Sequence, residues 1–143
     1  MISTDNLNNS AHKDERYNIW KSAFGVIKNN FILGVGTGDA STELKKEFLK
    51  RGYVEGYYDN LNSHNQYIEI LLESGIIGLM IFLSFQIYMI YIAISDRNLI
   101  YGLFIVMMLV FFSFETILNR LAGITFYSLF SFLLLYLKVE KNK

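Results

Sequence analysis

The hydrophobic and polar positions divide this chain into two parts of different character. Up to Glu73 apolar residues are interspersed with charged and polar ones, whereas after it they form long runs with few charges. The first run, from Gly75 to Ile94, contains twenty residues without a formal charge. At about 1.5 Å per helical residue, a run of this length spans the hydrocarbon core of a bilayer, about 30 Å. The pattern therefore predicts a membrane-crossing helix directly after a water-facing lobe.

Two further apolar runs follow, and short polar turns separate the three runs from one another. The last run is the shortest, and the second is interrupted only by Glu115. We therefore predict three transmembrane helices, over residues 75–94, 99–118 and 121–137. Gly75 and Gly78 form a pair of small residues in the first of them, a pattern that favours close contact with a neighbouring helix.

The first lobe helix is expected over residues 14–29, with Asp14 as its N-cap. Residues 1–13 show no periodicity and are expected to form a loop. Apolar residues recur in the helix at spacings of three and four, which is typical of a buried stripe. This stripe consists of Tyr17, Trp20, Phe24 and Ile27.

A glycine-rich turn follows, with Gly34, Gly36 and Gly38. The dinucleotide-binding fingerprint requires its third glycine three positions after the second. Here the third glycine comes after two positions, and Asp39 beside it would repel a phosphate. We therefore expect these glycines to permit positive φ angles and close backbone approach.

The next helix is expected over residues 40–51, where Gly52 ends it. Glu47 and Arg51 are spaced to pair across one helical turn, so this charged surface is expected to face water. A loop over 52–61 follows and carries three tyrosines, which suit either stacking on sugars or the level of lipid headgroups.

The last lobe helix is expected to begin at a cap formed by Asn62 or Ser63 and to run through Glu73. His64 lies near its start, just above the first membrane helix. An imidazole titrates close to neutral pH and suits general-base work at this level. The alternative, more common for a single histidine at a helix start, is a structural hydrogen bond. The face of His64 also carries Ile68, Leu71 and Gly75.

Arg16 and Glu115 are the other two candidates for chemistry. Arg16 is expected in the first helical turn, where a helix N-terminus and a guanidinium group together favour a phosphate or diphosphate. Its alternative is a surface arginine that packs on the Trp20 indole. Glu115, as an ionisable residue in a membrane span, is a functional candidate. Its alternative, which the pattern slightly favours, is an interfacial carboxylate that balances Arg120.

The composition excludes several kinds of site. The chain has no cysteine, which excludes disulfides, thiolate nucleophiles and cysteine metal ligands, and its only histidines are His12 and His64. Thirteen basic and thirteen acidic residues give a formal net charge of zero, so nothing indicates a nucleic-acid partner. We expect neither a metal nor another cofactor.

The charge of the C-terminus indicates the orientation in the membrane. Residues 138–143 carry three lysines and one glutamate, which is typical of a cytoplasmic tail. Three spans then place the lobe, residues 1–73, outside the cytoplasm. Because no apolar leader precedes the lobe, we also expect that Met1 is not the natural start of the working protein.

Three stretches in this order resemble the C-terminal part of the O-antigen ligase and polymerase family. They are ERYNIW at 15–20, ILGVGTGD at 32–39 and SHNQYIEILLESGIIGL at 63–79, with the membrane spans after them. The resemblance implies an all-α membrane protein of the bacterial inner membrane, with a periplasmic helical lobe followed by three transmembrane helices. Family members act in lipopolysaccharide and polysaccharide biosynthesis.

The resemblance also implies an activity and its residues. Such enzymes move a glycan, without a metal, from undecaprenyl diphosphate to an acceptor hydroxyl on a lipid A-core, a growing glycan or a protein. His64 matches the histidine assigned as general base, and Arg16 matches an arginine that would hold the diphosphate. As candidate substrate contacts we add Trp20, Asn65, Glu69, Tyr57, Tyr58 and Glu115.

Two features depart from the family pattern. The chain has no proline, whereas members usually carry one before the LGVG run. Members also have many more membrane helices, so we expect further N-terminal helices of the same enzyme, together with membrane lipid, as partners. The alternatives are a non-catalytic membrane protein whose lobe binds a glycan or a partner, and a truncated, inactive fragment.

Overall fold

The computed structural model describes the backbone of residues 4–139 and the side chains of residues 15–136. Every regular element in the described part is helical, which confirms the predicted all-α class. In chain order the elements are α1 (Thr4–Asn29), α2 (Ala40–Lys50), α3 (Val54–Tyr58), α4 (Gln66–Ser95), α5 (Leu99–Phe112), the 3₁₀ helix η1 (Ile117–Asn119) and α6 (Leu121–Val139).

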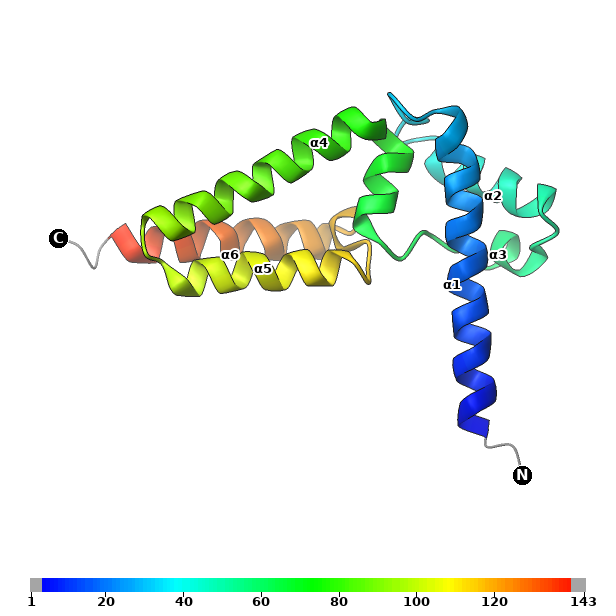
Figure 1. Cartoon of the computed structure of the whole chain (residues 1–143), viewed down its shortest axis with the longest axis horizontal. Helices are drawn as coiled ribbons and strands as arrows, with labels where there is room; N and C mark the ends of the chain where they lie inside the picture. The colour runs from blue at the N-terminus through cyan, green and yellow to red at the C-terminus, as the bar shows by residue number, and fades with distance from the viewer. Residues whose placement is uncertain (1–3, 140–143) are drawn as a thin grey trace.

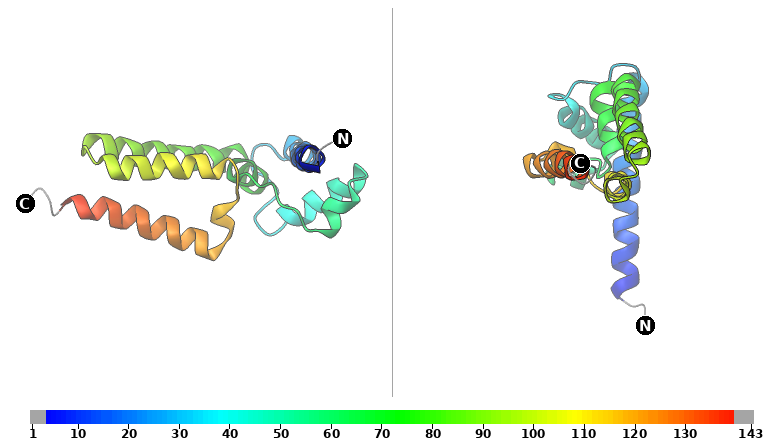
Figure 2. Two further views of the ribbon diagram at one scale, coloured as in Figure 1. Left: turned by 90° about the horizontal axis from the view of Figure 1, so that it is seen from below. Right: turned by 90° about the vertical axis from the view of Figure 1, so that its left-hand side faces the viewer.

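The helices form two parts that meet near the start of α4 (Figure 1). The lobe contains α1, α2, α3 and the first turns of α4. The rest of α4 runs away from the lobe beside α5 and α6, and these three helices form an elongated bundle (Figure 2). Helix α4 thus belongs to both parts and links them.

Helix α1 begins at Thr4, so the predictions of a loop over residues 4–13 and of an N-cap at Asp14 are wrong, and residues 1–3 of the predicted loop lie outside the described residues. No proline or glycine occurs in this stretch, so nothing stops the polar residues from continuing the helix. Arg16 consequently lies about three turns inside α1. The positive end of a helix does not reach that far, so a helix N-terminus does not contribute at Arg16, and Arg16 as a ligand of an anion stays a prediction.

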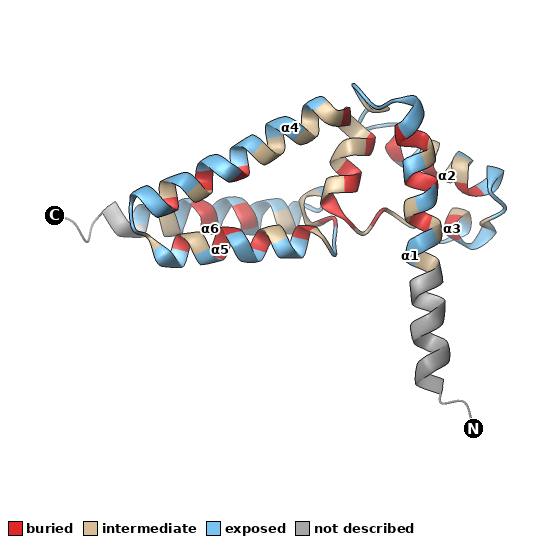
Figure 3. Ribbon diagram, in the orientation of Figure 1, coloured by how far each residue is buried: buried red, intermediate tan, exposed pale blue. Residues whose placement is uncertain are grey.

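The buried face of α1 also differs from the predicted stripe. Tyr17 is 62% exposed and Phe24 is 51% exposed, whereas Ala23 is fully buried. Of the predicted stripe, Ile27 is buried and Trp20 packs partly against the core, whereas Tyr17 and Phe24 face outward. The lobe core consists of Ile19, Ala23, Val26 and Ile27 from α1, Ala40, Leu44 and Phe48 from α2, and Ile68 and Leu72 from α4. These buried positions face one another across the lobe (Figure 3).

The second lobe helix agrees with its prediction. Helix α2 covers Ala40–Lys50, and Gly52 after it has a φ of 74°. The Arg51 Nε donates a hydrogen bond of 2.7 Å to Glu47 Oε1, as the spacing predicts. The loop expected after it contains one short helix, α3, in which Tyr57 lies partly against the core.

Helix α4 starts later than predicted and is broken. Its N-cap is Asn65, whose side-chain oxygen accepts from the backbone of Tyr67 and Ile68 at 3.0 and 3.1 Å. His64 therefore precedes the helix rather than lying on its face. At Gly75, φ is 64° and ψ is −164°, far from helical values.

The break at Gly75 is stabilised by the glycine-rich loop. Val35 N and Gly36 N donate to the carbonyls of Leu72 and Glu73, at 2.9 and 2.8 Å. Backbone groups that the break leaves without helical partners thus find them in the loop. A Cβ at Gly75 would overlap backbone atoms of this loop, so this contact requires a glycine. The predicted packing of Gly75 and Gly78 against a neighbouring helix stays a prediction.

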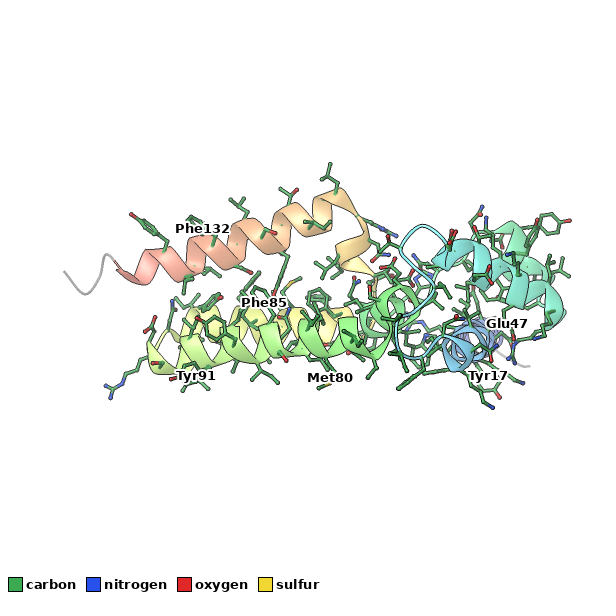
Figure 4. All side chains as sticks on the ribbon, turned by 90° about the horizontal axis from the view of Figure 1, so that it is seen from above. Tyr17, Glu47, Met80, Phe85, Tyr91 and Phe132 are labelled. Atoms are coloured by element: carbon green, nitrogen blue, oxygen red, sulfur yellow. The ribbon has the colours of Figure 1, made fainter. Side chains whose placement is uncertain are left out.

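One helix of the bundle has the length and composition that the sequence predicts for a membrane helix. Helix α4 is long and apolar enough to cross a membrane, and only 17% of its most apolar window is buried. A helix in the core of a soluble protein would be mostly buried, so this exposure favours a lipid environment. Met80 and Tyr91 project outward from α4, and Phe132 from α6 (Figure 4).

The two other apolar helices are shorter. Helix α5 ends at Phe112, although the predicted span continued to residue 118. The residues after it, Ser113 to Thr116, form a non-helical segment whose polar groups turn back toward the lobe. Helix α6 begins at Leu121, as predicted. The layout of three complete spans stays a prediction.

Candidate functional site

The lobe and the bundle meet through two polar segments, residues 62–66 before α4 and residues 113–119 between α5 and α6. We call this contact the junction. The Asn62 amide donates to the hydroxyl of Thr116 at 3.0 Å, and the Asn65 amide donates to the Ser113 carbonyl at 3.1 Å. Each bond crosses from one segment to the other, so the junction has a fixed register.

Gln66 adds two more bonds across the junction. Its side-chain oxygen accepts from the backbone N–H of Leu118 at 2.7 Å, and its amide nitrogen donates to the Asn119 side chain at 3.0 Å. Gln66 is nearly fully buried, so both of its polar atoms are satisfied without water.

His64 is held at the junction in an unusual backbone conformation. Its φ is 45°, a left-handed value that is rare for residues other than glycine, although histidine and asparagine adopt it more readily than most. The backbone N–H of His64 donates to the Asn62 side chain at 3.1 Å, which closes an Asx turn. This turn fixes the position of the backbone from which the imidazole extends. Strained positions of this kind persist where the surroundings determine them.

Glu115 lies directly beside His64. Its Oε1 atom is 3.5 Å from Nδ1 of the imidazole, and the two side chains remain 48% and 31% exposed. The two residues come from opposite segments of the junction. Glu115 therefore pairs with His64, and the interpretation of Glu115 as the partner of Arg120 is wrong.

Trp20 fixes the loop that carries His64 from the lobe side. Its indole N–H donates to the Ser63 carbonyl at 2.9 Å. Ser63 is fully buried, and its hydroxyl donates to the carboxylate of Glu69. Glu69 is itself only 7% exposed, so its carboxylate faces the protein interior and supports the loop.

Arg16 lies one turn before Trp20 on the same face of α1, at the spacing where side chains are neighbours. Its side chain is exposed. Trp20 in turn contacts Ser63, the residue that precedes His64. Arg16 is thereby related to the junction through Trp20.

Tyr57 and Tyr58 lie elsewhere. Their rings contact each other edge to face, with centroids 5.3 Å apart, and Tyr58 is 72% exposed. They belong to α3, which lies on the side of the lobe that faces away from the bundle (Figure 1). The structure does not bring these two tyrosines to His64 and Glu115.

Glu73, which contacts the junction residue Asn119, is a carboxylate that sequence reasoning did not single out. The Asn119 amide donates to its Oε1 atom at 3.4 Å. Burial raises the pKa of Glu73 above its ordinary value, the nearby Glu69 charge raises it further, and the bond from Asn119 opposes both. This carboxylate is in the part of α4 before the break, which packs against the lobe.

The arrangement offers a base and its partner. Within residues 15–136 no group of three or more His, Cys, Asp and Glu side chains is placed to hold a metal ion. A proton on Nδ1 of His64 directed at Glu115 leaves Nε2 with a free lone pair. Chemically, such a pair can accept a proton from a hydroxyl group.

A comparison with protein families gives one match. The family model described as O-antigen ligase matches residues 3–83, more than half of the chain. This range includes Arg16, Trp20 and His64 but ends before Glu115. No curated protein and no solved structure shows a significant match. The match over most of the lobe and the start of the bundle shows that this chain belongs to the O-antigen ligase family.

Proposed function

We propose that this chain is part of a membrane glycosyltransferase that moves a glycan from undecaprenyl diphosphate to an acceptor hydroxyl. Membership of the O-antigen ligase family supports glycan transfer in general. The observation that carries the proposal is the pair of His64 and Glu115, held at the base of an apolar helix bundle. A lipid-linked donor would present its diphosphate at this level.

His64 is the general base of the proposed reaction. The acceptor oxygen attacks the anomeric carbon of the donor sugar, and the bond from that carbon to the diphosphate oxygen breaks. The acceptor proton passes to Nε2 of His64, and the imidazolium later releases it to water. Glu115 stabilises the positive charge that the imidazole gains, because its carboxylate faces Nδ1 at 3.5 Å.

Arg16 binds the donor diphosphate in this proposal. A guanidinium group suits phosphate oxygens in charge and in shape, and it offsets the charge that grows on the leaving group. The helix dipole contributes nothing here, since Arg16 lies inside α1. Its assignment is supported by the family resemblance and by its place one turn from Trp20.

Diphosphate is a good leaving group, so the reaction needs positioning and charge stabilisation more than strong activation. We therefore propose a metal-independent reaction. In the proposed topology the lobe and the junction lie on the periplasmic side of the inner membrane. The lysine-rich tail, residues 138–143, lies in the cytoplasm.

Substitution of His64 in the chromosomal gene tests this function. His64→Gln keeps a polar side chain of similar length but removes the base. Electrophoresis of the surface polysaccharides should show that glycan transfer is lost and that lipid-linked donor accumulates. Lys50→Gln, an exposed position at the end of α2, is the matched control and should transfer normally.

Two results separate the alternatives. Normal transfer by His64→Gln cells would show that His64 is not the base and would favour a lobe that only binds glycan or a partner. Loss of transfer at a normal level of membrane-inserted protein would support the catalytic role. The protein level is measured by immunoblot of the same membranes.

A further inference from the structure

The loop between α1 and α2 exposes three consecutive apolar side chains. Phe31, Ile32 and Leu33 are 50%, 63% and 72% exposed, respectively. No charged residue occurs from Asn29 to Gly38. A run of exposed apolar residues on a water-facing loop is unfavourable, and contiguous patches of this kind mark interaction surfaces.

Hydrogen bonds place this apolar tip at the level where the uncharged part of α4 begins. Ile76 N donates to the Phe31 carbonyl at 2.8 Å, and Ile77 N donates to the Ile32 carbonyl at 3.5 Å. The tip and the first turn after the break in α4 therefore lie side by side (Figure 1). If α4 enters the bilayer after Gly75, the tip is at the bilayer surface.

The exposed apolar surface continues from the tip along α4. Ile77, Met80 and Ile81 follow at spacings of three and four and are 48%, 58% and 66% exposed. Met80 points away from the other helices of the bundle (Figure 4). This continuity between the loop and a lipid-facing helix indicates the same surroundings for both.

The loop is held too firmly to fold its apolar tip under the lobe. Gly34 has a φ of 70°, and a Cβ there would overlap the backbone of Glu73 and Ser74. After the tip, the backbone N–H groups of Val35 and Gly36 donate to carbonyls of α4. The carbonyl of Phe31, at the start of the tip, accepts from the same helix, so both ends of the tip are tied to α4.

We propose that Phe31, Ile32 and Leu33 insert among the acyl chains at the membrane surface and anchor the lobe beside the first turn of the membrane-crossing part of α4. This anchor fixes the height of His64 above the bilayer, because the same helix start carries both. The inference requires that α4 crosses the membrane. It does not depend on glycan transfer.

Single cysteine variants test the anchor, because the chain has no cysteine of its own. Leu33→Cys is labelled with a nitroxide, and the full protein is reconstituted in vesicles of phosphatidylethanolamine and phosphatidylglycerol. Collision rates with oxygen, which enriches in lipid, are compared with those of a water-soluble nickel chelate. Thr37→Cys in the same loop is the water-exposed control, and Ile81→Cys on α4 is the lipid-exposed control.

The anchor predicts that the label at position 33 collides preferentially with oxygen, as at position 81, whereas the label at 37 prefers nickel. A label at 33 that behaves like that at 37 would overturn it. Shielding at 33 from both reagents would overturn it too, because another protein surface would then cover the tip. A water-exposed label at 81 would refute membrane insertion itself, without bearing on His64.

Discussion

Removing the charge of Glu115 tests the pairing on which the proposed chemistry depends. Glu115→Gln keeps a side-chain carbonyl that can accept a hydrogen bond from Nδ1 of His64, and it removes the negative charge. The substitution changes little in the fold, because Glu115 is 48% exposed. Its effect should therefore report how strongly the carboxylate stabilises an imidazolium.

The magnitude follows from the distance of 3.5 Å between Glu115 Oε1 and His64 Nδ1. Two unit charges at that separation attract by about 1.2 kcal/mol in water and by about 5 kcal/mol at an effective dielectric constant of about 20. Both side chains are partly exposed, so the lower end applies, about 1–2 kcal/mol. The rate of glycan transfer should fall roughly 5- to 30-fold.

The assay is the initial rate of glycan transfer in isolated membranes supplied with lipid-linked donor and acceptor. Glu55→Gln, which neutralises an exposed carboxylate on α3, is the matched control and should keep the wild-type rate. Adding Glu115→Gln to His64→Gln should cause no further loss, since the carboxylate acts through the imidazole. A rate within twofold of wild type, or full additivity in the double variant, would refute this reasoning.

Two predictions concern stability. Gly75→Ala should destabilise the protein by at least about 2 kcal/mol and lower its melting temperature by roughly 5–10 °C. The reasons are that an L-residue is strained at a φ of 64° and that its Cβ meets the loop backbone. The control is Gly38→Ala, which has open space around it and should change the melting temperature little. The pKa of Glu73 is raised above its ordinary value of 4.5, so above pH 4.5 this carboxyl group holds its proton more tightly in the folded protein than in the unfolded chain. As pH rises from 4.5 through the raised pKa, the loss of this proton lowers the stability of the folded state. The melting temperature of Glu73→Gln relative to wild type should therefore increase from pH 4 to pH 7, and a difference that is independent of pH would contradict the assignment.

Much of the fold is visible in the sequence because it depends on local patterns. The end of α1, the bounds of α2 and the start of α6 follow from periodicity and from capping glycines. The positive φ angles of Gly34 and Gly36 were also predictable, although Gly38, expected to behave in the same way, does not have one. These features need only neighbouring residues, so a single sequence contains them.

Features set by distant contacts were missed. The buried face of α1 is set by packing against α2 and α4, where Ile19 and Ala23 are buried, and the spacing of aromatic residues does not show this. The break at Gly75 depends on a loop some forty residues earlier that supplies hydrogen bonds to it. The predicted lobe helix ends at Glu73 and the predicted membrane helix starts at Gly75, so the boundary was placed correctly, but periodicity gives no sign of the non-helical backbone at Gly75.

The candidate site shows the same division. His64 could be found from its place above an apolar run, but its partner Glu115 comes from a different polar segment. The sequence instead suggested Arg120, which is nearer in the chain, as the partner of Glu115. A usable signal was present, since Asn62, Gln66, Thr116 and Asn119 are polar residues that flank the apolar runs on the same side. Polar residues at matching ends of neighbouring apolar helices favour a shared contact of this kind.

The most direct test of the central claim is the single-turnover rate of glycan transfer by purified His64→Gln protein that is saturated with lipid-linked donor. The account predicts that the variant still binds the donor and transfers at least about 100-fold more slowly than wild type, the range expected for loss of a general base. Transfer within a few-fold of the wild-type rate, with donor bound, would contradict the assignment of His64 as the base.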